Sequence, residues 1–303
     1  MAEVSFKKAL VALDATLMDG FVLEYVSKFY KSFGIEEIIF LHAIKEIDTR
    51  IEIDGYEDAE TNVLDEIKEK LTYKVSQYDF KDSKTEIVVK HGSPAGIILK
   101  DAVESSFDLI VMGRKRSLGG SGIVSSHIAR KSPTSILFVT QNMNPSLRNI
   151  LVPVDFSEHS SLATHAGVNI EKHSNAKLSL INIYDVPLGY YKMGKTYEEF
   201  AEIMEGHAKN DFELFLKSNE LDTKYPCHFT VRGSNSKIDI VFEHALESRS
   251  DLIIIGSQGR TNASAVLLGS FAEKMVFRDT DIPVLIVKKE GENMSLLQAL
   301  LSL

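Results

Sequence analysis

Residues 250–260 read SDLIIIGSQGR, an apolar run typical of a strand buried on both faces, followed by a glycine-containing turn. Residues 107–113 read FDLIVMG, and the glycines that end the two runs, Gly113 and Gly256, lie 143 positions apart. Two more pairs recur at an offset of 141 residues, namely Asp14 with Asp155 at the ends of ALVALD and ILVPVD, and Gly92 with Gly233 in HGSP and RGSN. This nearly constant spacing indicates that one structural unit occurs twice in the chain.

Each half contains five short apolar runs rich in β-branched residues, separated by longer amphipathic stretches such as 238–246. The runs are 9–13, 38–43, 87–89, 109–112 and 136–139 in the first half, and 150–154, 178–183, 229–231, 252–255 and 284–287 in the second. Strands that alternate with helices predict βαβ units with right-handed crossovers. We therefore predict an α/β fold of two tandem, doubly wound, five-stranded parallel-sheet domains of the Rossmann-like type.

The composition limits the classes of function. The chain has 303 residues, 44% of them hydrophobic and 25% charged, as in soluble globular proteins of about two domains. Its net charge of -9 disfavours binding to nucleic acid or to an anionic membrane, and it has no apolar run of about 18 residues that would span a bilayer. The single cysteine, Cys227, excludes an internal disulfide and fits a reducing compartment. We expect a cytoplasmic protein.

The polar segment QNMNPSL at 141–147 reads as a linker and sets the domain boundaries. We predict domain 1 at residues 1–143, domain 2 at 147–290, and a short amphipathic tail at 291–303. Because the linker is short, we expect domain 1 to pack on domain 2. A tail helix of this length is marginal by itself, so it either docks on its own domain or binds a protein partner.

The most informative motif is GSQGRTNASAVLLGS at 256–270, which joins a predicted buried strand to the helix pattern FAEKMVF. Ligands of open α/β sheets bind at this edge, where the N–H groups of a helix N-terminus attract anions. Gly256 and Gly259 lack a Cβ, so the backbone can turn and approach a phosphate closely, and Gly269 can do the same before the helix. Ser270 offers a hydroxyl and an amide to phosphate oxygens.

Two of these assignments have a purely structural alternative. Ser270 and Glu273 match an S-x-x-E capping box that would start the helix without any ligand. Asp155 could equally cap a helix that begins near Ser157. The nine histidines show no metal-ligand spacing, and neither a G-x-S-x-G elbow nor a phosphate-binding G-x4-G-K-[S/T] loop occurs, so metal binding is left unassigned.

The glycine spacing resembles the universal stress protein family, whose ATP-binding members carry G-x2-G-x9-G-[S/T] between the fourth strand and the last helix. The resemblance also covers VPVDFSE, the RGS turn, SDLIIIGSQGR and DIPVLIVKK. It implies a tandem universal stress protein with adenine nucleotide alpha hydrolase-like domains. It further implies that ATP, with Mg²⁺, binds domain 2 through a set of cofactor-binding residues: Pro153, Asp155, Ile183, Gly256, Gly259, Arg260, Gly269, Ser270 and Phe271.

Within that set, the resemblance places Asp155 beside the adenosine and the backbone of Ile183 against adenine. Domain 1 departs from the motif in GRKRSLGGSGI, where Arg116 replaces the second glycine, Gly122 follows after five residues, and Ile123 stands in place of the serine. These departures argue against ATP binding there. The basic run from Arg114 to Arg116 binds another anion or forms a solvated turn.

The leading functional hypothesis is therefore a cytoplasmic ATP-binding regulatory protein of the stress response. In it, the segment from Arg260 to Leu268 would close over the phosphates. The alternatives are a weak ATPase or phosphotransfer enzyme, in which Asp155 with Mg²⁺ supports slow hydrolysis, and a protein-interaction scaffold with a vestigial nucleotide site. Family members commonly dimerise through their last strands, so TSILFV and IPVLIV are expected to pair within the chain. A homodimer or another protein partner completes the expected set of interactions.

Overall fold

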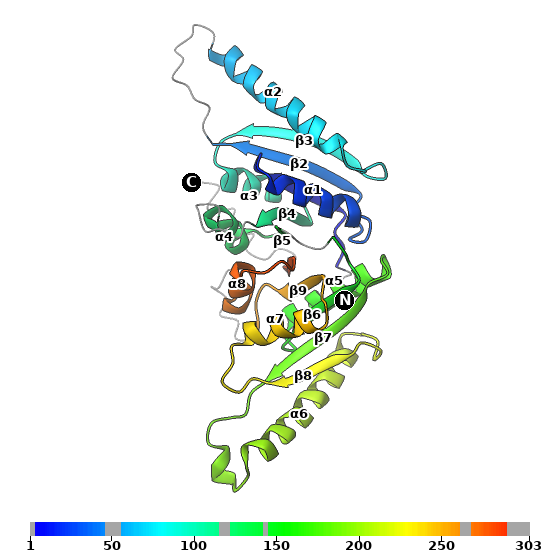
Figure 1. Cartoon of the computed structure of the whole chain (residues 1–303), viewed down its shortest axis with the longest axis vertical. Coiled ribbons are helices and arrows are strands. Elements are labelled where there is room, and N and C mark those ends of the chain that lie inside the picture. Colours follow the sequence, from blue (N-terminus) through cyan, green and yellow to red (C-terminus); the bar gives the residue numbers. More distant parts are fainter. Residues whose placement is uncertain (1–3, 46–55, 115–121, 142–144, 261–267, 290–303) are drawn as a thin grey trace. The chain divides into compact units, whose positions relative to one another are not determined.

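The computed structural model describes residues 4–45, 56–114, 122–141, 145–260 and 268–289. The chain divides into two compact units, whose main segments are Ser5–Pro145 and Ser146–Arg278. Each unit is an α/β domain, as predicted (Figure 1). The predicted tail at 291–303 lies outside the described residues, and the packing of one domain on the other stays a prediction.

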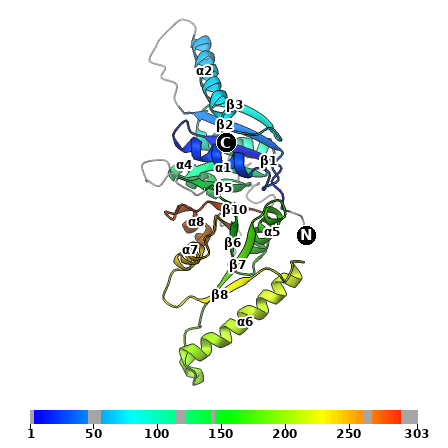
Figure 2. The same cartoon turned by 45° about the vertical axis from the view of Figure 1, so that its right-hand side comes forward.

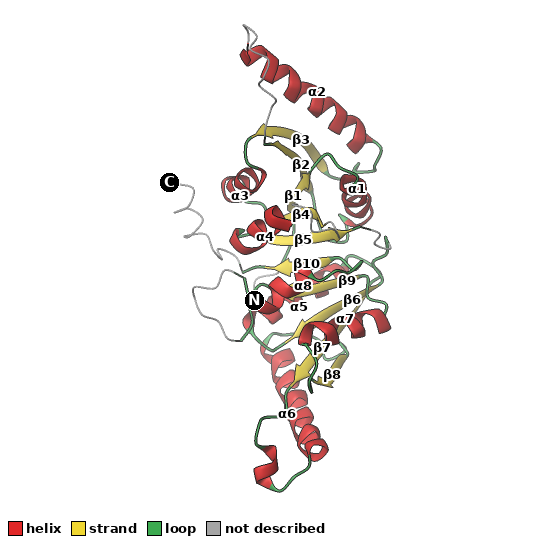
Figure 3. Cartoon of the chain, turned by 60° about the vertical axis from the view of Figure 1, so that its left-hand side comes forward, coloured by secondary structure: helices red, strands yellow, loops and turns green. Residues whose placement is uncertain are grey.

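Domain 1 is built on a parallel sheet with the strand order β3-β2-β1-β4-β5. The strands are β1 (Lys8–Leu13), β2 (Glu37–Ile44), β3 (Lys84–His91), β4 (Leu109–Arg114) and β5 (Ser135–Thr140). The helices are α1 (Met18–Phe29), α2 (Tyr56–Ser76), α3 (Pro94–Glu104) and α4 (Gly122–Lys131). Figure 3 shows α1 on the opposite face of the sheet from α3 and α4, the arrangement expected when the chain winds away from the first strand in both directions.

Domain 2 repeats this design with the strand order β10-β9-β6-β7-β8, again in parallel. Its strands are β6 (Asn149–Val154), β7 (Lys177–Tyr184), β8 (Cys227–Val231), β9 (Leu252–Gly256) and β10 (Val284–Val287). The helices are α5 (Glu158–Lys172), the 3₁₀ turn η1 (Tyr190–Met193), α6 (Tyr197–Ser218), α7 (Lys237–Glu247) and α8 (Ser270–Phe277). Figure 2 shows the long helix α6 running beside β8.

Burial explains why these runs form strands. In β9, Leu252 to Ile255 are all buried, and all four residues of β10 are buried, because helices cover both faces of the sheet. The edge strand β3 differs, since its residues are exposed or half-buried and its first three are polar. The apolar run at 87–89 therefore marks only the middle of an eight-residue strand. No helix within the described residues is both long and apolar enough to cross a membrane.

Candidate functional site

The site lies at the carboxyl ends of β6, β7 and β9 in domain 2. Strand β6 lies between β7 and β9. The chain continues from β6 to β7 and β8 on one side of it and then forms β9 and β10 on its other side, so a crevice is expected at the end of β6. The register pairs Pro153 with Ile181 and Val154 with Asn182, which places Ile183 next to Asp155. Ile183 is half-buried and is the penultimate residue of β7, so the strand runs one residue beyond it.

Asp155 organises the turn that follows β6. Its Oδ1 atom accepts hydrogen bonds from the backbone N–H of Ser157 at 3.1 Å and from the Ser157 hydroxyl at 2.6 Å. Ser157, rather than Asp155, is the N-cap of α5, and its side chain accepts from the N–H of Ser160. The alternative that Asp155 caps this helix is therefore wrong, although it orients the residue that does.

The loop after β9 meets this turn. The backbone N–H of Arg260 donates to Asp155 Oδ2 at 3.0 Å, across 105 residues of sequence, and Arg260 Nε donates to the backbone oxygen of Asp155. The guanidinium of Arg260 also stacks over the Phe156 ring, 5.5 Å from its centroid. The structure thus brings Asp155 close to Gly259 and Arg260 of the loop after β9. The sequence analysis had assigned these residues to one site.

Gly256 and Gly259 of the motif are required for different physical reasons. A Cβ on Gly259 would lie 2.9 Å from Asp155 Oδ2, so only glycine leaves that carboxylate its position. A Cβ on Gly256 would lie 2.6 Å from the backbone oxygen of His159 in the first turn of α5. Gly256 is therefore required for packing of the strand against the helix, whether or not a ligand binds.

The last part of the motif starts helix α8. Gly269 is its N-cap residue and makes no side-chain cap hydrogen bond, while Ser270 and Phe271 are the first two helical residues. Ser270 is thus not the N-cap of a capping box, and its side chain is exposed. The N–H of Glu273 makes the bond to Gly269 O that closes the first turn, at 2.9 Å. The N–H groups of Ser270 and Phe271 belong to the first turn of the helix, whose N–H groups have no partner within the helix and attract anions.

The Tyr184 hydroxyl, at the end of β7, has a shifted pKa. Burial raises the pKa of the Tyr184 hydroxyl, and Glu205, which accepts its hydrogen bond at 3.4 Å, raises it further. Tyr184 follows Ile183 at the end of β7, and its phenol stays protonated at neutral pH. The predicted moving segment lies outside the described residues, except for Arg260 and Leu268 at its ends.

Comparison with known proteins agrees with this architecture. The model of the universal stress protein family matches residues 5–140 and, a second time, residues 146–288. The chain belongs to the universal stress protein family. Because the match occurs twice, it is a tandem universal stress protein.

Some relatives of this tandem universal stress protein match about half of the chain, and others match nearly all of it. A universal stress protein of Methanocaldococcus jannaschii is 28% identical over 152 residues, covering 50% of this chain and 88% of that protein. The crystal structure of a universal stress protein from Archaeoglobus fulgidus covers 93% of this chain and 96% of its own, with a TM-score of 0.65 and 21% identity, which supports the fold. A universal stress protein in complex with cAMP is 26% identical, with 46% and 95% of the chains covered and a TM-score of 0.29.

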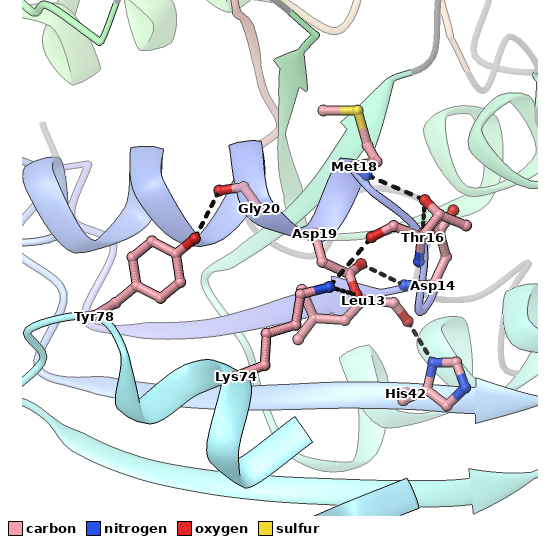
Figure 4. A network of polar contacts seen from close by, with 9 residues as sticks. All are labelled: Leu13, Asp14, Thr16, Met18, Asp19, Gly20, His42, Lys74 and Tyr78. Carbon is pink, nitrogen blue, oxygen red and sulfur yellow. Dashed lines mark hydrogen bonds and ion pairs between the residues drawn. The ribbon is translucent and has the colours of Figure 1, made fainter. Parts of the chain in front are cut away.

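Domain 1 of this universal stress protein keeps the turn but fills it differently (Figure 4). The Asp14 carboxylate accepts from the Thr16 N–H at 3.1 Å and from its hydroxyl at 2.5 Å, as Asp155 does from Ser157. The N–H of Asp14 donates to the buried Asp19, which forms an ion pair with Lys74 of α2 at 2.9 Å. Lys115 and Arg116 of the basic run lie outside the described residues.

Sequence reasoning missed the strained residue after each aspartate. Ala15 and Phe156 have φ angles of 58° and 63°, a left-handed conformation that non-glycine residues rarely adopt and that clusters at functional sites. It also missed a matching buried contact at the neighbouring strand. Nδ1 of His42 donates to Leu13 O in domain 1, and Nδ2 of Asn182 donates to Val154 O in domain 2, both at 2.9 Å.

Proposed function

We propose that this universal stress protein is an ATP-binding regulatory protein and that its second domain holds the nucleotide, with Mg²⁺. The observation that carries the proposal is the contact between the turn at Asp155 and the loop at Gly259, made through the 3.0 Å bond from Arg260 N–H to Asp155 Oδ2. Two segments far apart in sequence meet where ligands of open α/β sheets bind.

The chemistry of this crevice suits an adenine nucleotide. The carboxylate of Asp155 can accept hydrogen bonds from the hydroxyl groups of a ribose. The backbone of Ile183 lies next to Asp155, where we place the adenine. The triphosphate would extend to the start of α8, where the amides of Ser270 and Phe271 and the helix dipole favour negative charge. The glycine at position 259 keeps the path between them open.

A regulatory role fits better than an enzymatic one. We assign Asp155 to the ribose and to the turn, where Oδ1 accepts from Ser157 and Oδ2 from the Arg260 N–H, and we assign no residue as a base that would activate water. A nucleotide that favours one arrangement of the Arg260 loop over another would bias how the protein meets its partners. We place this regulation in the stress response of the cytoplasm, with a homodimer or another protein as the partner.

The first test is to denature freshly purified protein, identify the released nucleotide by chromatography and count it per chain. We expect about one ATP per chain. A count near two would assign a second site to domain 1, and neither release nor uptake of Mg-ATP would refute the proposal. Release of cAMP instead would keep the site and change its ligand.

A matched pair of variants tests the location of the site. Gly259→Arg places a side chain against Asp155, whereas Gly206→Arg places the same side chain on the exposed face of α6, where a Cβ has nothing within 4 Å. We expect ATP binding to be lost in the first variant and kept in the second, with both folded. Equal affinity in the two would remove the nucleotide from this crevice. Steady ATP turnover that Asp155→Asn abolishes would show an enzyme.

A further inference from the structure

A hollow lies on the α6 side of the turn at Asp155. It has a volume of about 690 Å³ and is lined by the carboxyl-terminal half of α6 and by Phe156 and Arg260. The hollow is wide open to solvent, so a ligand would lie against its lining with one side exposed. The adenine and phosphate positions proposed above lie instead at Ile183 and at the start of α8.

One wall of the hollow is apolar. The ring of Phe156 packs on Phe215 at 5.5 Å between centroids and on Phe212 at 6.2 Å. Beside them, Leu214 is 65% exposed and lines the opening. An exposed leucine next to a fixed aromatic pair provides a surface that gains free energy when an apolar group covers it.

The lining of the hollow also carries positive charge. Lys217 and Arg260 both line the hollow, and Asp211 is the single acidic residue among its described lining residues. Lys217 makes no ion pair within the part of the chain that the structure describes. The guanidinium of Arg260 lies over the Phe156 ring and donates to the Asp155 backbone oxygen, which places its charge beside the aromatic lining of the hollow.

Domain 1 lacks these features at the matching positions, which lie 141 residues earlier. Ala15 corresponds to Phe156, and Lys74 corresponds to Phe215. The ammonium of Lys74 reaches into the turn, where it donates to Thr16 O at 3.2 Å and to Asp19 at 2.9 Å (Figure 4). The same place is therefore filled by an internal ion pair in domain 1 and by an aromatic wall in domain 2.

We propose that the hollow formed by Phe156, Leu214, Phe215, Lys217 and Arg260 binds a small amphipathic anion, with an aromatic or short acyl body and a carboxylate or sulfonate group. The apolar body covers Leu214 and the rings of Phe156 and Phe215. The anionic group faces the charged ends of Lys217 and Arg260. This site shares Arg260 with the proposed nucleotide site and takes its other lining residues from α6 and from Phe156, so its test is run with and without Mg-ATP. It would make domain 2 responsive to a metabolite of this class.

The test is a fluorescence titration of the full chain with anilinonaphthalene sulfonate, an aromatic sulfonate, in the presence and absence of Mg-ATP. Leu214→Glu places a negative charge in the hollow, and Tyr73→Glu makes the same change at the matching position of domain 1, which is 72% exposed. We expect Leu214→Glu to weaken dye binding about tenfold or more, and Tyr73→Glu to leave it unchanged. Circular dichroism checks that both variants stay folded.

Lys217→Ala gives a second readout. It should weaken the sulfonate dye several-fold while leaving a neutral anilinonaphthalene unaffected, because only the charged group faces the ammonium. Equal dye affinity in Leu214→Glu and Tyr73→Glu would overturn the proposal. Loss of the dye on adding Mg-ATP, with no effect of Leu214→Glu, would place it in the crevice at Asp155 and also overturn it.

Discussion

Replacing Gly256 by alanine tests whether this glycine serves packing. A Cβ there would lie 2.6 Å from His159 O and 2.7 Å from His159 C, whereas ordinary contacts begin at 3.4 Å. An overlap of about 0.8 Å against His159 O has to be relieved by moving the first turn of α5 or the end of β9. Overpacking of a core costs about 1–3 kcal/mol, and backbone neighbours place this case near 3 kcal/mol.

Gly113→Ala in domain 1 is the matched control. The new Cβ would lie 2.3 Å from Met18 Cγ and 3.3 Å from Val22 Cγ2, which are side-chain atoms. Met18 is buried, but an unbranched side chain can change rotamer where a helix backbone cannot, so we expect a cost near the low end of the overpacking range, about 1–2 kcal/mol. Both variants also gain the lower unfolded-state entropy of alanine, so the difference between them isolates the packing effect.

The assay is thermal unfolding of the full chain by calorimetry. For a domain of about 150 residues, 1 kcal/mol shifts the Tm by roughly 2–4 °C, so Gly256→Ala should lower the Tm of its domain by about 6–12 °C and Gly113→Ala by only a few degrees. Saturating Mg-ATP should leave the difference in place. Equal shifts, or an unchanged Tm for Gly256→Ala, would refute the packing argument and make a ligand the reason for this glycine.

Three further outcomes follow from the described contacts. Lys74→Met leaves the buried carboxylate of Asp19 without its cation, so it should lower the free energy of unfolding by about 2 kcal/mol in urea titrations, less than a fully buried pair because Lys74 is 36% exposed. Burial raises the pKa of Cys227 to about 12, so about one thiol in 10⁵ is ionised at pH 7 and alkylation by iodoacetamide should be far slower in the folded than in the unfolded chain. Burial and the stacked His228 lower the pKa of His244. The unfolded chain therefore binds the proton more readily than the folded chain, and the free energy of unfolding should fall as pH drops below about 6.5. His244→Phe should reduce this dependence of stability on pH.

The fold was predictable because the central strands are buried on both faces. All ten strands within the described residues contain an apolar run that the sequence shows, and the duplicated landmarks indicate the tandem arrangement. The prediction was least accurate at the edges. Strand β3 spans Lys84–His91 where only 87–89 was expected, because an edge strand needs apolar residues only where a helix covers it.

The site was predictable only in part. The spacing of Gly259 from Asp155 along the chain says nothing about their contact, but topology brings the ends of β6 and β9 together, so both were assigned to one site. The packing role of Gly256 depends on how closely α5 approaches β9, which no pattern of residue types reveals. The stack of Arg260 on Phe156 likewise depends on the left-handed backbone at Phe156.

The two domains show how one backbone can give different sites. Both keep the aspartate turn and its left-handed residue, with φ angles of 58° and 63°, so the strained geometry is not what distinguishes them. The difference is what reaches the turn from the long helix, a lysine at position 74 or a phenylalanine at position 215. An ion pair fills domain 1 with its own side chains, whereas the aromatic wall of domain 2 leaves a hollow beside Arg260. Ligand binding would therefore concentrate in domain 2 even where both domains share the fold and the aspartate.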